Sequence, residues 1–471
     1  MDAFSFDVIV IGAGPAGYVC AIRCAQLGMS VACIDQWSDK NNKPSLGGTC
    51  LNVGCIPSKA LLDSSHHYSF LNEHAGEHGI KISEATIDVA KMQQRKNKVV
   101  KTLTTGVKGL LKKNKINFFH GTASFVDANT LNISGEQEQQ ISAKSIIIAT
   151  GSKPFELDFL PIDQNKILDS TGALSLTSVP QHLGVIGAGV IGLEMASVWS
   201  RLGAKVTIWE ALDDFLPSVD KDISTQAQKI LLKQGIDIEL SCKVQSAQIH
   251  DEVVKVSVLK DGQESTIEVS HLLVAIGRVA NTQGLGLDTV NITCDQRGFI
   301  QTDDGWRTNI ENVYAIGDVI GGAMLAHKGS EEGVALAEQL AGQHGHVNYH
   351  AIPWVIYTWP EVAWAGATEE KLNDQNIQYS KGKFPFMALG RARAMGETEG
   401  LIKFLSDAQT DQLLGVHIVG PNASELIAEA VVALESELTA EDLARTIHGH
   451  PTLSEGLHEA ALDVAGRAIH F

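Results

Sequence analysis

The stretch that decides the fold is Val8-Ile9-Val10-Ile11-Gly12-Ala13-Gly14-Pro15-Ala16-Gly17, near the start of the chain. Its four β-branched apolar residues predict a buried strand, and the glycines predict a tight turn into a helix. Gly12 permits the turn, Gly14 lets backbone N–H groups approach a pyrophosphate, and Gly17 permits close helix–strand packing. Asp35 ends the next predicted strand, where a carboxylate can bind ribose hydroxyls. The stretch therefore predicts a dinucleotide-binding unit.

A second copy of this unit follows later in the chain. The strand 183–186 leads into Gly187-Ala188-Gly189-Val190-Ile191-Gly192, and Glu210 ends the next strand. One such loop is weak evidence, but two loops that each precede an acidic residue predict two dinucleotide sites. The run 211–220 contains no Lys or Arg and three Asp, so it would repel a 2′-phosphate and favours NAD over NADP. A Gly317-Asp318 element suggests FAD in the first site.

Length and composition limit the class of protein. A chain of 471 residues exceeds one compact core, and its formal charge of -18 argues against nucleic acid as a partner. The apolar run 8–11 is too short for a secretory signal, and we find no stretch of about 18 apolar residues that could span a bilayer. The seven cysteines do not form an extracellular framework. We expect a cytoplasmic enzyme, or an organelle matrix enzyme if the sequence is a mature form, with no bound metal.

Two cysteines stand apart from Cys20, Cys24 and Cys33, which we interpret as packing residues. Cys50 and Cys55 lie in Gly47-Gly48-Thr49-Cys50-Leu51-Asn52-Val53-Gly54-Cys55-Ile56-Pro57-Ser58-Lys59, where paired glycines predict a loop entering a helix. A helix N-terminus lowers the pKa of a nearby thiol and so favours a reactive thiolate. The spacing is awkward on a regular helix, so a disulfide requires a local distortion, which Gly54 and Pro57 would supply. We predict a redox-active pair.

With these features, the chain from 8 to 471 resembles the pyridine-nucleotide disulfide oxidoreductases. The resemblance rests on the cysteine segment, on Gly-Leu-Glu at 192–194, on 314–318, and on His448-Gly449-His450-Pro451-Thr452-Leu453-Ser454-Glu455. It implies an α/β fold with two Rossmann-like dinucleotide-binding domains and a C-terminal α+β dimerisation domain. The expected segments are 1–150 for FAD, 151–276 for NAD, 277–348 as a central domain that completes the FAD site, and 349–471 as the dimer interface.

The resemblance also implies roles for individual residues. Cys50 would attack the substrate, while Cys55 would face the flavin as the charge-transfer thiolate. Lys59 would lie by the flavin N5 and pair with Glu194. His450, oriented by Glu455, would be the acid–base group for the cysteines of the other subunit in a homodimer. Further cofactor contacts are expected at Thr49, Lys59, Gly121, Thr150, Gly151, Gly277, Asp318 and Ala326.

The implied reaction is the oxidation of protein-bound dihydrolipoamide with reduction of NAD. Its partner would be the lipoyl domain of the acyltransferase core of a 2-oxo acid dehydrogenase complex, or a glycine-cleavage carrier protein. A glutathione-type reductase would need NADPH-binding arginines after the second glycine loop, and these are missing. A purely structural subunit is the other alternative.

We interpret His448 as structural. The long loop 36–45, and Asp35 where the family more commonly has Glu, depart from the pattern.

Overall fold

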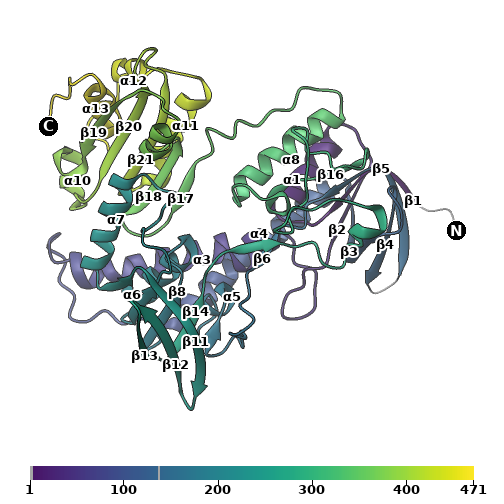
Figure 1. The fold of residues 1–471 in the computed structure, drawn as a ribbon, viewed down its shortest axis with the longest axis horizontal. Coiled ribbons are helices and arrows are strands. Elements are labelled where there is room, and N and C mark those ends of the chain that lie inside the picture. The colour runs from purple at the N-terminus through teal and green to yellow at the C-terminus, as the bar shows by residue number, and fades with distance from the viewer. Residues whose placement is uncertain (1–3, 136–137) are drawn as a thin grey trace. The chain divides into compact units, whose positions relative to one another are not determined.

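The predicted strand 8–11 lies inside a six-stranded sheet, as Figure 1 shows for the computed structural model, which describes residues 4–135 and 138–471. Parallel pairing runs in the order β3, β2, β1, β5, β16, and β4 joins β3 and β5 in an antiparallel hairpin. Every residue from Val8 to Ile11 is buried, because helices or other chain segments cover both faces of the sheet. The strands are β1 (Phe4–Ile11), β2 (Val31–Asp35), β3 (Asn117–Phe125), β4 (Thr130–Gly135), β5 (Gln139–Ile148) and β16 (Val313–Ala315).

This sheet belongs to the first of two compact units, which joins residues 1–60, 93–155 and 277–347. On one face, α1 packs against α8 so closely that a Cβ at Gly333 would lie 2.7 Å from the Ala16 carbonyl oxygen. The helical elements are α1 (Pro15–Gln26), α2 (Gly48–Val53), the 3₁₀ turns Leu287–Val290 and Gly317–Ile320, and α8 (Ala326–Leu340); β6 (Ser152–Pro154) pairs with β15 (Arg278–Ala280).

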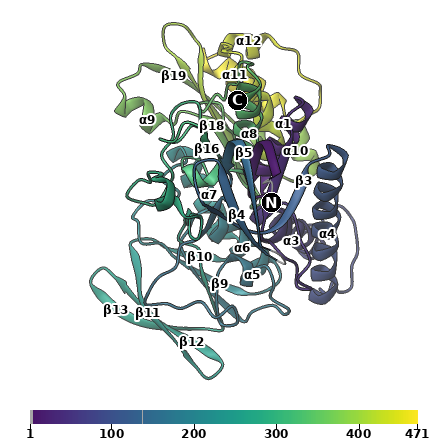
Figure 2. The ribbon, with the colours of Figure 1, turned by 90° about the vertical axis from the view of Figure 1, so that its right-hand side faces the viewer.

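The second unit joins residues 61–92, 156–276 and 348–471. Its second dinucleotide fold is a parallel sheet in the order β10, β9, β8, β14, β7, with an antiparallel sheet β11–β12–β13 packed on one face and seen at the lower left of Figure 2. The elements are β7 (Ile167–Leu168), α5 (Ser170–Ala173), β8 (His182–Ile186), α6 (Val190–Arg201), β9 (Lys205–Trp209), α7 (Lys221–Lys233), β10 (Ile236–Glu239), β11 (Cys242–His250), β12 (Val253–Lys260), β13 (Gln263–Val269) and β14 (His271–Val274).

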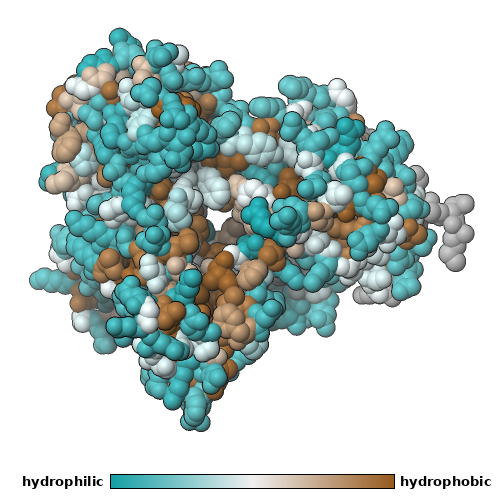
Figure 3. Space-filling model, in the orientation of Figure 1, coloured by the Kyte–Doolittle hydropathy of each residue, from teal (hydrophilic) through white to brown (hydrophobic). Residues whose placement is uncertain are grey.

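The C-terminal part of this unit is an antiparallel sheet in the order β17, β18, β21, β20, β19, with α11 and α13 packed on it. On the face drawn in Figure 3, hydrophilic side chains cover most of this part. The elements are β17 (Trp354–Ile356), β18 (Glu361–Gly366), α9 (Glu369–Asp374), β19 (Tyr379–Pro385), the 3₁₀ turn Phe386–Ala388, α10 (Gly390–Met395), β20 (Leu401–Asp407), β21 (Leu413–Gly420), α11 (Ala423–Glu435), α12 (Ala440–Arg445) and α13 (Glu455–Val464).

The helical part of the chain between residues 55 and 113 is interrupted. It forms α3 (Cys55–Ser69), a π-helical turn (Phe70–His74) and α4 (Val89–Lys113), with non-helical chain at 80–88. Residues 61–92 group with the second unit, because Leu61, Leu62, Val89 and Met92 join the core formed with α6 and α7. None of the helices in the two described ranges is long and apolar enough to cross a membrane.

Candidate active site

The first glycine loop has the backbone geometry that the sequence predicts. Gly12 has φ +106°, and a Cβ there would lie 2.3 Å from the Ala149 carbonyl oxygen, so only glycine fits. A Cβ at Gly17 would lie 1.9 Å from the Gly12 carbonyl oxygen. Gly14 is the N-cap of α1, so no capping side chain covers the first N–H groups of that helix. The loop therefore fits a pyrophosphate group at a helix N-terminus.

The second glycine loop repeats this geometry. Gly187 has φ +99°, and a Cβ would lie 2.6 Å from the Ala275 carbonyl oxygen. A Cβ at Gly192 would lie 2.2 Å from the Gly187 carbonyl oxygen, and Gly189 is the N-cap of α6. The two loops thus offer two equivalent anion sites, as expected for one flavin and one nicotinamide dinucleotide.

In each dinucleotide fold, the acidic residue at the end of the second strand accepts a hydrogen bond from the glycine loop of the same fold. Asp35 Oδ2 accepts a hydrogen bond from Ala13 N at 2.5 Å, and Glu210 Oε2 accepts one from Ala188 N at 2.8 Å. Burial raises the pKa of Asp35, and the N–H groups of Trp37 and Ala13 offset only part of that rise. Both carboxylates are therefore fixed beside the loops, where ribose hydroxyls would lie.

The loop 36–45 is closed by contacts within the first unit. Ser38 forms a β-bridge with Pro44, and Ser38 Oγ lies 3.1 Å from His120 Nε2. Gln36 Oε1 accepts a hydrogen bond from Thr122 at 3.1 Å. The longer connection after Asp35 is thus fastened to strand β3, next to the carboxylate.

The other predicted cofactor contacts gather at the carboxyl end of the first sheet. Thr150 and Gly151 follow β5, and Thr150 Oγ1 donates to the Asn281 carbonyl at 2.7 Å. Asp318 lies in the 3₁₀ turn after β16, where its Oδ2 accepts a hydrogen bond from Ser152 at 2.5 Å. Of the other predicted contacts, Gly121 lies in β3, Gly277 directly precedes β15, and Ala326 is the first residue of α8.

The cysteine segment begins on the first glycine loop. Gly47 N donates to the Ala13 carbonyl at 2.9 Å, and a Cβ at Gly48 would lie 2.7 Å from Gly14 Cα. Thr49 and Cys50 lie in the short helix α2, and Cys55 begins α3. The first dinucleotide site and the redox pair are therefore joined through backbone contacts.

A helix break at Gly54 brings the two cysteines together. Gly54 ends α2 with φ −134° and ψ −115°, and the Cys50 and Cys55 side chains are hydrogen-bonding neighbours. Pro57 lies in the first turn of α3 and has no N–H to donate to the carbonyl of Val53, the last residue of α2, so its place is compatible with the predicted distortion. The structure thus places the predicted pair on the two sides of the break between α2 and α3.

The pKa of Cys50 differs from the prediction. The hydrogen bond with Cys55, burial and the negative charge of Cys55 raise the pKa of the Cys50 thiol, although the charge of Lys59 acts in the opposite direction. The expected lowering by a helix N-terminus was wrong for Cys50, because the neighbouring sulfur dominates.

Glu194 lies in α6 and is buried, with only 3% of its surface exposed. Its Oε1 accepts a hydrogen bond from the backbone N–H of Tyr357 at 3.1 Å. Lys59 and Glu194 belong to different units, so their pairing stays a prediction.

The C-terminal histidine and glutamate form a direct pair. His450 Nδ1 lies 2.7 Å from Glu455 Oε1, and Glu455 Oε2 accepts a hydrogen bond from Thr452 N at 2.8 Å. Burial would raise the pKa of Glu455, but the Thr452 N–H and His450 lower it below its ordinary value. The His450 side chain is 78% exposed, so its ring is held at one nitrogen and open to reactants. His448 instead bonds Glu429 at 2.7 Å with a side chain only 7% exposed, which fits a structural residue.

Three supporting residues escaped the sequence prediction. Asn52 Nδ2 donates to the Gly48 carbonyl at 2.9 Å and thereby braces α2. Arg278 Nε donates to Ser152 Oγ at 2.7 Å, and Ser152 in turn holds Asp318. No sequence pattern connects Arg278 with Ser152, which lies 126 residues earlier in the chain.

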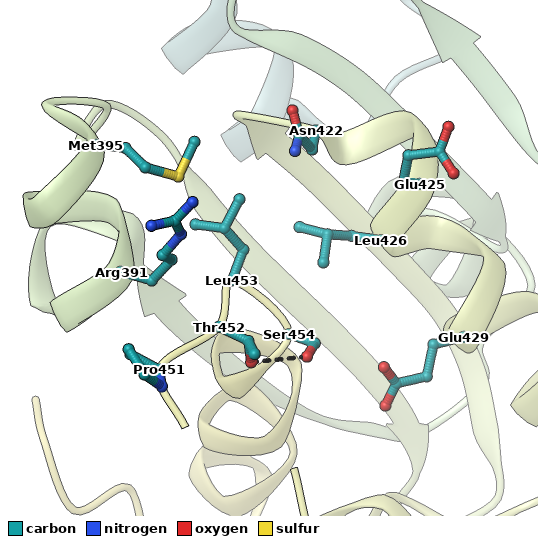
Figure 4. A pocket seen from close by; sticks show the side chains of 10 residues that line it. All are labelled: Arg391, Met395, Asn422, Glu425, Leu426, Glu429, Pro451, Thr452, Leu453 and Ser454. Atoms are coloured by element: carbon teal, nitrogen blue, oxygen red, sulfur yellow. Dashed lines mark hydrogen bonds between the residues drawn. The ribbon is translucent and has the colours of Figure 1, made fainter. Parts of the chain in front are cut away.

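A cavity of about 410 Å³ opens beside the segment that follows His450. Figure 4 shows it between α10, α11 and residues 451–454, with the Thr452–Ser454 hydrogen bond at its lower edge. Arg391, Glu425 and Glu429 supply charge, while Met395, Leu426 and Leu453 supply apolar surface. The sequence predicted none of these residues as site residues.

Comparisons with known proteins agree with this geometry. Residues 6–333 match the family model of the pyridine nucleotide-disulphide oxidoreductases, and residues 352–461 match the dimerisation domain of that family. The chain is 49% identical to a dihydrolipoyl dehydrogenase of Cupriavidus necator over 99% of each chain. It is 48% identical to a mitochondrial dihydrolipoyl dehydrogenase of Schizosaccharomyces pombe over 99% of this chain and 91% of that one.

Solved structures show the same likeness. LpdA from Mycobacterium tuberculosis is similar with a TM-score of 0.89 at 25% identity, covering 98% of this chain and 99% of that one. The Cu(II) complex of an HOCl-induced flavoprotein disulfide reductase from Escherichia coli gives 0.86 at 29% identity, with the same coverage. The predicted fold class, the redox activity and the two cofactors, FAD and NAD, are confirmed. The chain belongs to the pyridine nucleotide-disulphide oxidoreductases.

Proposed function

We propose that the chain is a dihydrolipoyl dehydrogenase, which oxidises protein-bound dihydrolipoamide to lipoamide and reduces NAD. The observation that carries the proposal is the 49% identity to a relative of that name over nearly the whole length of both chains. The paired thiols and the His450–Glu455 hydrogen bond supply the chemical groups that the reaction needs.

In this proposal the cofactors occupy the two glycine loops. Residues 1–150 and the central segment 277–348 bind FAD, residues 151–276 bind NAD, and residues 349–471 form the interface. The FAD contacts are Gly12, Gly14, Gly17, Asp35, Thr49, Lys59, Gly121, Thr150, Gly151, Asp318 and Ala326, and the NAD contacts are Gly187, Gly189, Gly192 and Glu210. Gly277, the first residue of the central segment, is a further cofactor contact. When bound, FAD accepts an electron pair from the dithiol and transfers it to NAD as hydride.

The thiol chemistry belongs to the chain's own residues. His450, held by Glu455, removes a proton from one substrate thiol, and the resulting thiolate attacks Cys50 of the Cys50–Cys55 disulfide. The bond between the two cysteines breaks, and Cys55 leaves as a thiolate. The second substrate thiol then attacks the substrate sulfur of the mixed disulfide, which releases lipoamide with Cys50 as the leaving group. Cys50 takes up the proton that His450 carries, and His450 accepts the proton of the second thiol, so that one proton stays on His450 and Cys55 remains a thiolate. The hydrogen bond with Cys55 and burial raise the pKa of Cys50, which supports Cys50 as the sulfur that ends the step protonated.

The match to a dimerisation domain supports a homodimer. In our proposal each His450 serves the cysteines of the other subunit. The partner is the lipoyl domain of a 2-oxo acid dehydrogenase complex or a glycine-cleavage carrier protein, and we keep the cytoplasm or an organelle matrix as the predicted location.

Stopped-flow reduction of the FAD-loaded enzyme tests the substrate class. Dihydrolipoamide should give a long-wavelength charge-transfer band and rapid NADH formation, because the reduced pair retains an ionised sulfur. NADPH with oxidised glutathione should give no turnover. Turnover with glutathione and none with dihydrolipoamide would contradict the proposal and favour the glutathione-type alternative.

A further inference from the structure

The first two turns of α8 contain an ion pair that the redox chemistry does not use. Lys328 Nζ lies 3.0 Å from Glu332 Oε1, and the two side chains are 2% and 0% exposed. Removing two charges from water is costly, so a buried ion pair is weak evidence for stability by itself. The contacts of the pair indicate instead that it holds one backbone turn in position.

Both residues bind the backbone of the turn that carries Asp318. Lys328 Nζ donates to the carbonyl oxygens of Gly317 and Gly321 at 3.2 Å and 3.1 Å, and Glu332 Oε2 accepts from Gly317 N at 2.8 Å. With Glu332 as the third acceptor, the three N–H bonds of the ammonium group all have partners. The pair therefore fastens both ends of the turn 317–321.

The turn has little freedom to adjust if this fastening is lost. Gly317 and Gly321 both have φ +77°, a conformation that L side chains rarely adopt. A Cβ at Gly317 would lie 2.9 Å from the Cβ of Ala16, within the first glycine loop. Ser152 donates a hydrogen bond to Asp318 Oδ2 and so fixes one carboxylate oxygen. The position of the other oxygen, Oδ1, then depends on the backbone of the turn.

We propose that Lys328 and Glu332 are positioning residues for the FAD site, which act by holding the turn 317–321 so that Asp318 keeps its place beside the first glycine loop. This inference rests on the proposed contact between Asp318 and FAD. It extends the site to a buried pair that acts through the turn.

The test measures FAD dissociation from the holoenzyme by the recovery of flavin fluorescence after dilution, which does not depend on turnover. Glu332→Gln should speed dissociation by about 10- to 100-fold, the effect of losing a charge-assisted hydrogen bond. Lys328→Arg keeps the charge and should fold, but its planar guanidinium cannot reach all three acceptors, so about 3- to 10-fold is expected.

Glu338→Gln is the matched control. It removes the ion pair of Arg23 and Glu338, 2.6 Å apart, which joins α1 to the later part of α8, outside the turn that carries Asp318. FAD dissociation from this variant should be unchanged. If the control accelerates dissociation as much as Glu332→Gln does, the pair merely stabilises the helices and the inference fails.

A double-mutant cycle with Asp318→Asn separates this inference from the proposed site. If Glu332 acts through Asp318, the double variant should lose FAD no more than about 3-fold faster than the worse single variant. Independent, multiplying effects would overturn the inference, as would normal dissociation from both Glu332→Gln and Lys328→Arg. Normal dissociation from Asp318→Asn alone would instead remove Asp318 from the proposed FAD contacts.

Discussion

His450 illustrates how one residue acquires a chemical role. Its Nδ1 is bound to Glu455, which leaves the other ring nitrogen of a largely exposed side chain to exchange protons. The lowered pKa of Glu455 keeps this carboxylate ionised at pH values where an ordinary Glu becomes protonated. The interaction is therefore fully present above the ordinary Glu pKa and is lost as the pH falls through the lowered one.

The first prediction concerns this pair. His450→Gln should lower dihydrolipoamide-dependent kcat by about 10²- to 10⁴-fold, the usual contribution of a positioned acid–base group, while FAD remains bound. Steady-state kinetics with a flavin absorbance spectrum checks both expectations. The control is His448→Gln, which removes the bond to Glu429 and should cost less than about 10-fold. Equal decreases of kcat in the two variants would contradict the acid–base role of His450.

At the scale of elements, the break between α2 and α3 is what pairs the cysteines. A continuous helix would separate Cys50 and Cys55 on its surface, whereas the chain turns at Gly54. A Cβ at this position would lie 2.9 Å from the Thr49 carbonyl oxygen and 3.2 Å from Cys50 Cα. No alanine fits there without moving the residues that carry the first sulfur.

Gly54→Ala should therefore slow reduction of the enzyme by dihydrolipoamide by about 10- to 100-fold, because misplacing reacting atoms by about 1 Å is costly. Stopped-flow absorbance measures this rate, and the FAD content should stay normal. Gly106→Ala in α4 is the control, since a Cβ there meets open space and should stabilise the helix by about 0.5–1 kcal/mol. A normal reduction rate in Gly54→Ala would show that the break is dispensable.

At the scale of the molecule, a buried lysine joins two parts of the second unit. Lys403 of β20 is 1% exposed, and its ammonium group binds Asp220 and Asp222 at the start of α7 and Glu369 of α9. In Figure 1, α7 lies next to β21 of the C-terminal sheet. The network thus connects the second dinucleotide fold with that sheet.

Lys403→Met should lower the free energy of unfolding by about 3–5 kcal/mol, because it leaves buried carboxylates without their cation. Urea unfolding followed by circular dichroism measures the change. Lys381→Met is the control, because Lys381 binds Glu369 at 2.7 Å but is 48% exposed, so less than about 1 kcal/mol is expected. Similar losses in both variants would contradict a special role for the buried cation.

The same network predicts acid sensitivity. Burial would raise the pKa of Asp222, but hydrogen bonds from Lys383 and Lys403 lower it to about 2. Burial would likewise raise the pKa of Glu369, and Lys381, Lys403 and Tyr379 lower it to about 2. Since these folded-state pKa values are depressed, their stabilisation is present above the ordinary carboxyl range and is lost as the pH falls toward 2. In Lys403→Met this loss on acidification should be smaller.

The sequence by itself determined the two glycine loops, the acids Asp35 and Glu210, the redox pair and the His450–Glu455 pair. Each of these depends on residues close together in the chain, where spacing and backbone geometry restrict the outcome. Only the tertiary structure decided that Ser152 and Arg278 brace Asp318, that Lys328 and Glu332 fasten its turn, and that Lys403 meets Asp220. It also decided that residues 61–92 join the second unit. These partners come from distant strands and helices, and sheet order and helix packing, which no local pattern encodes, bring them together.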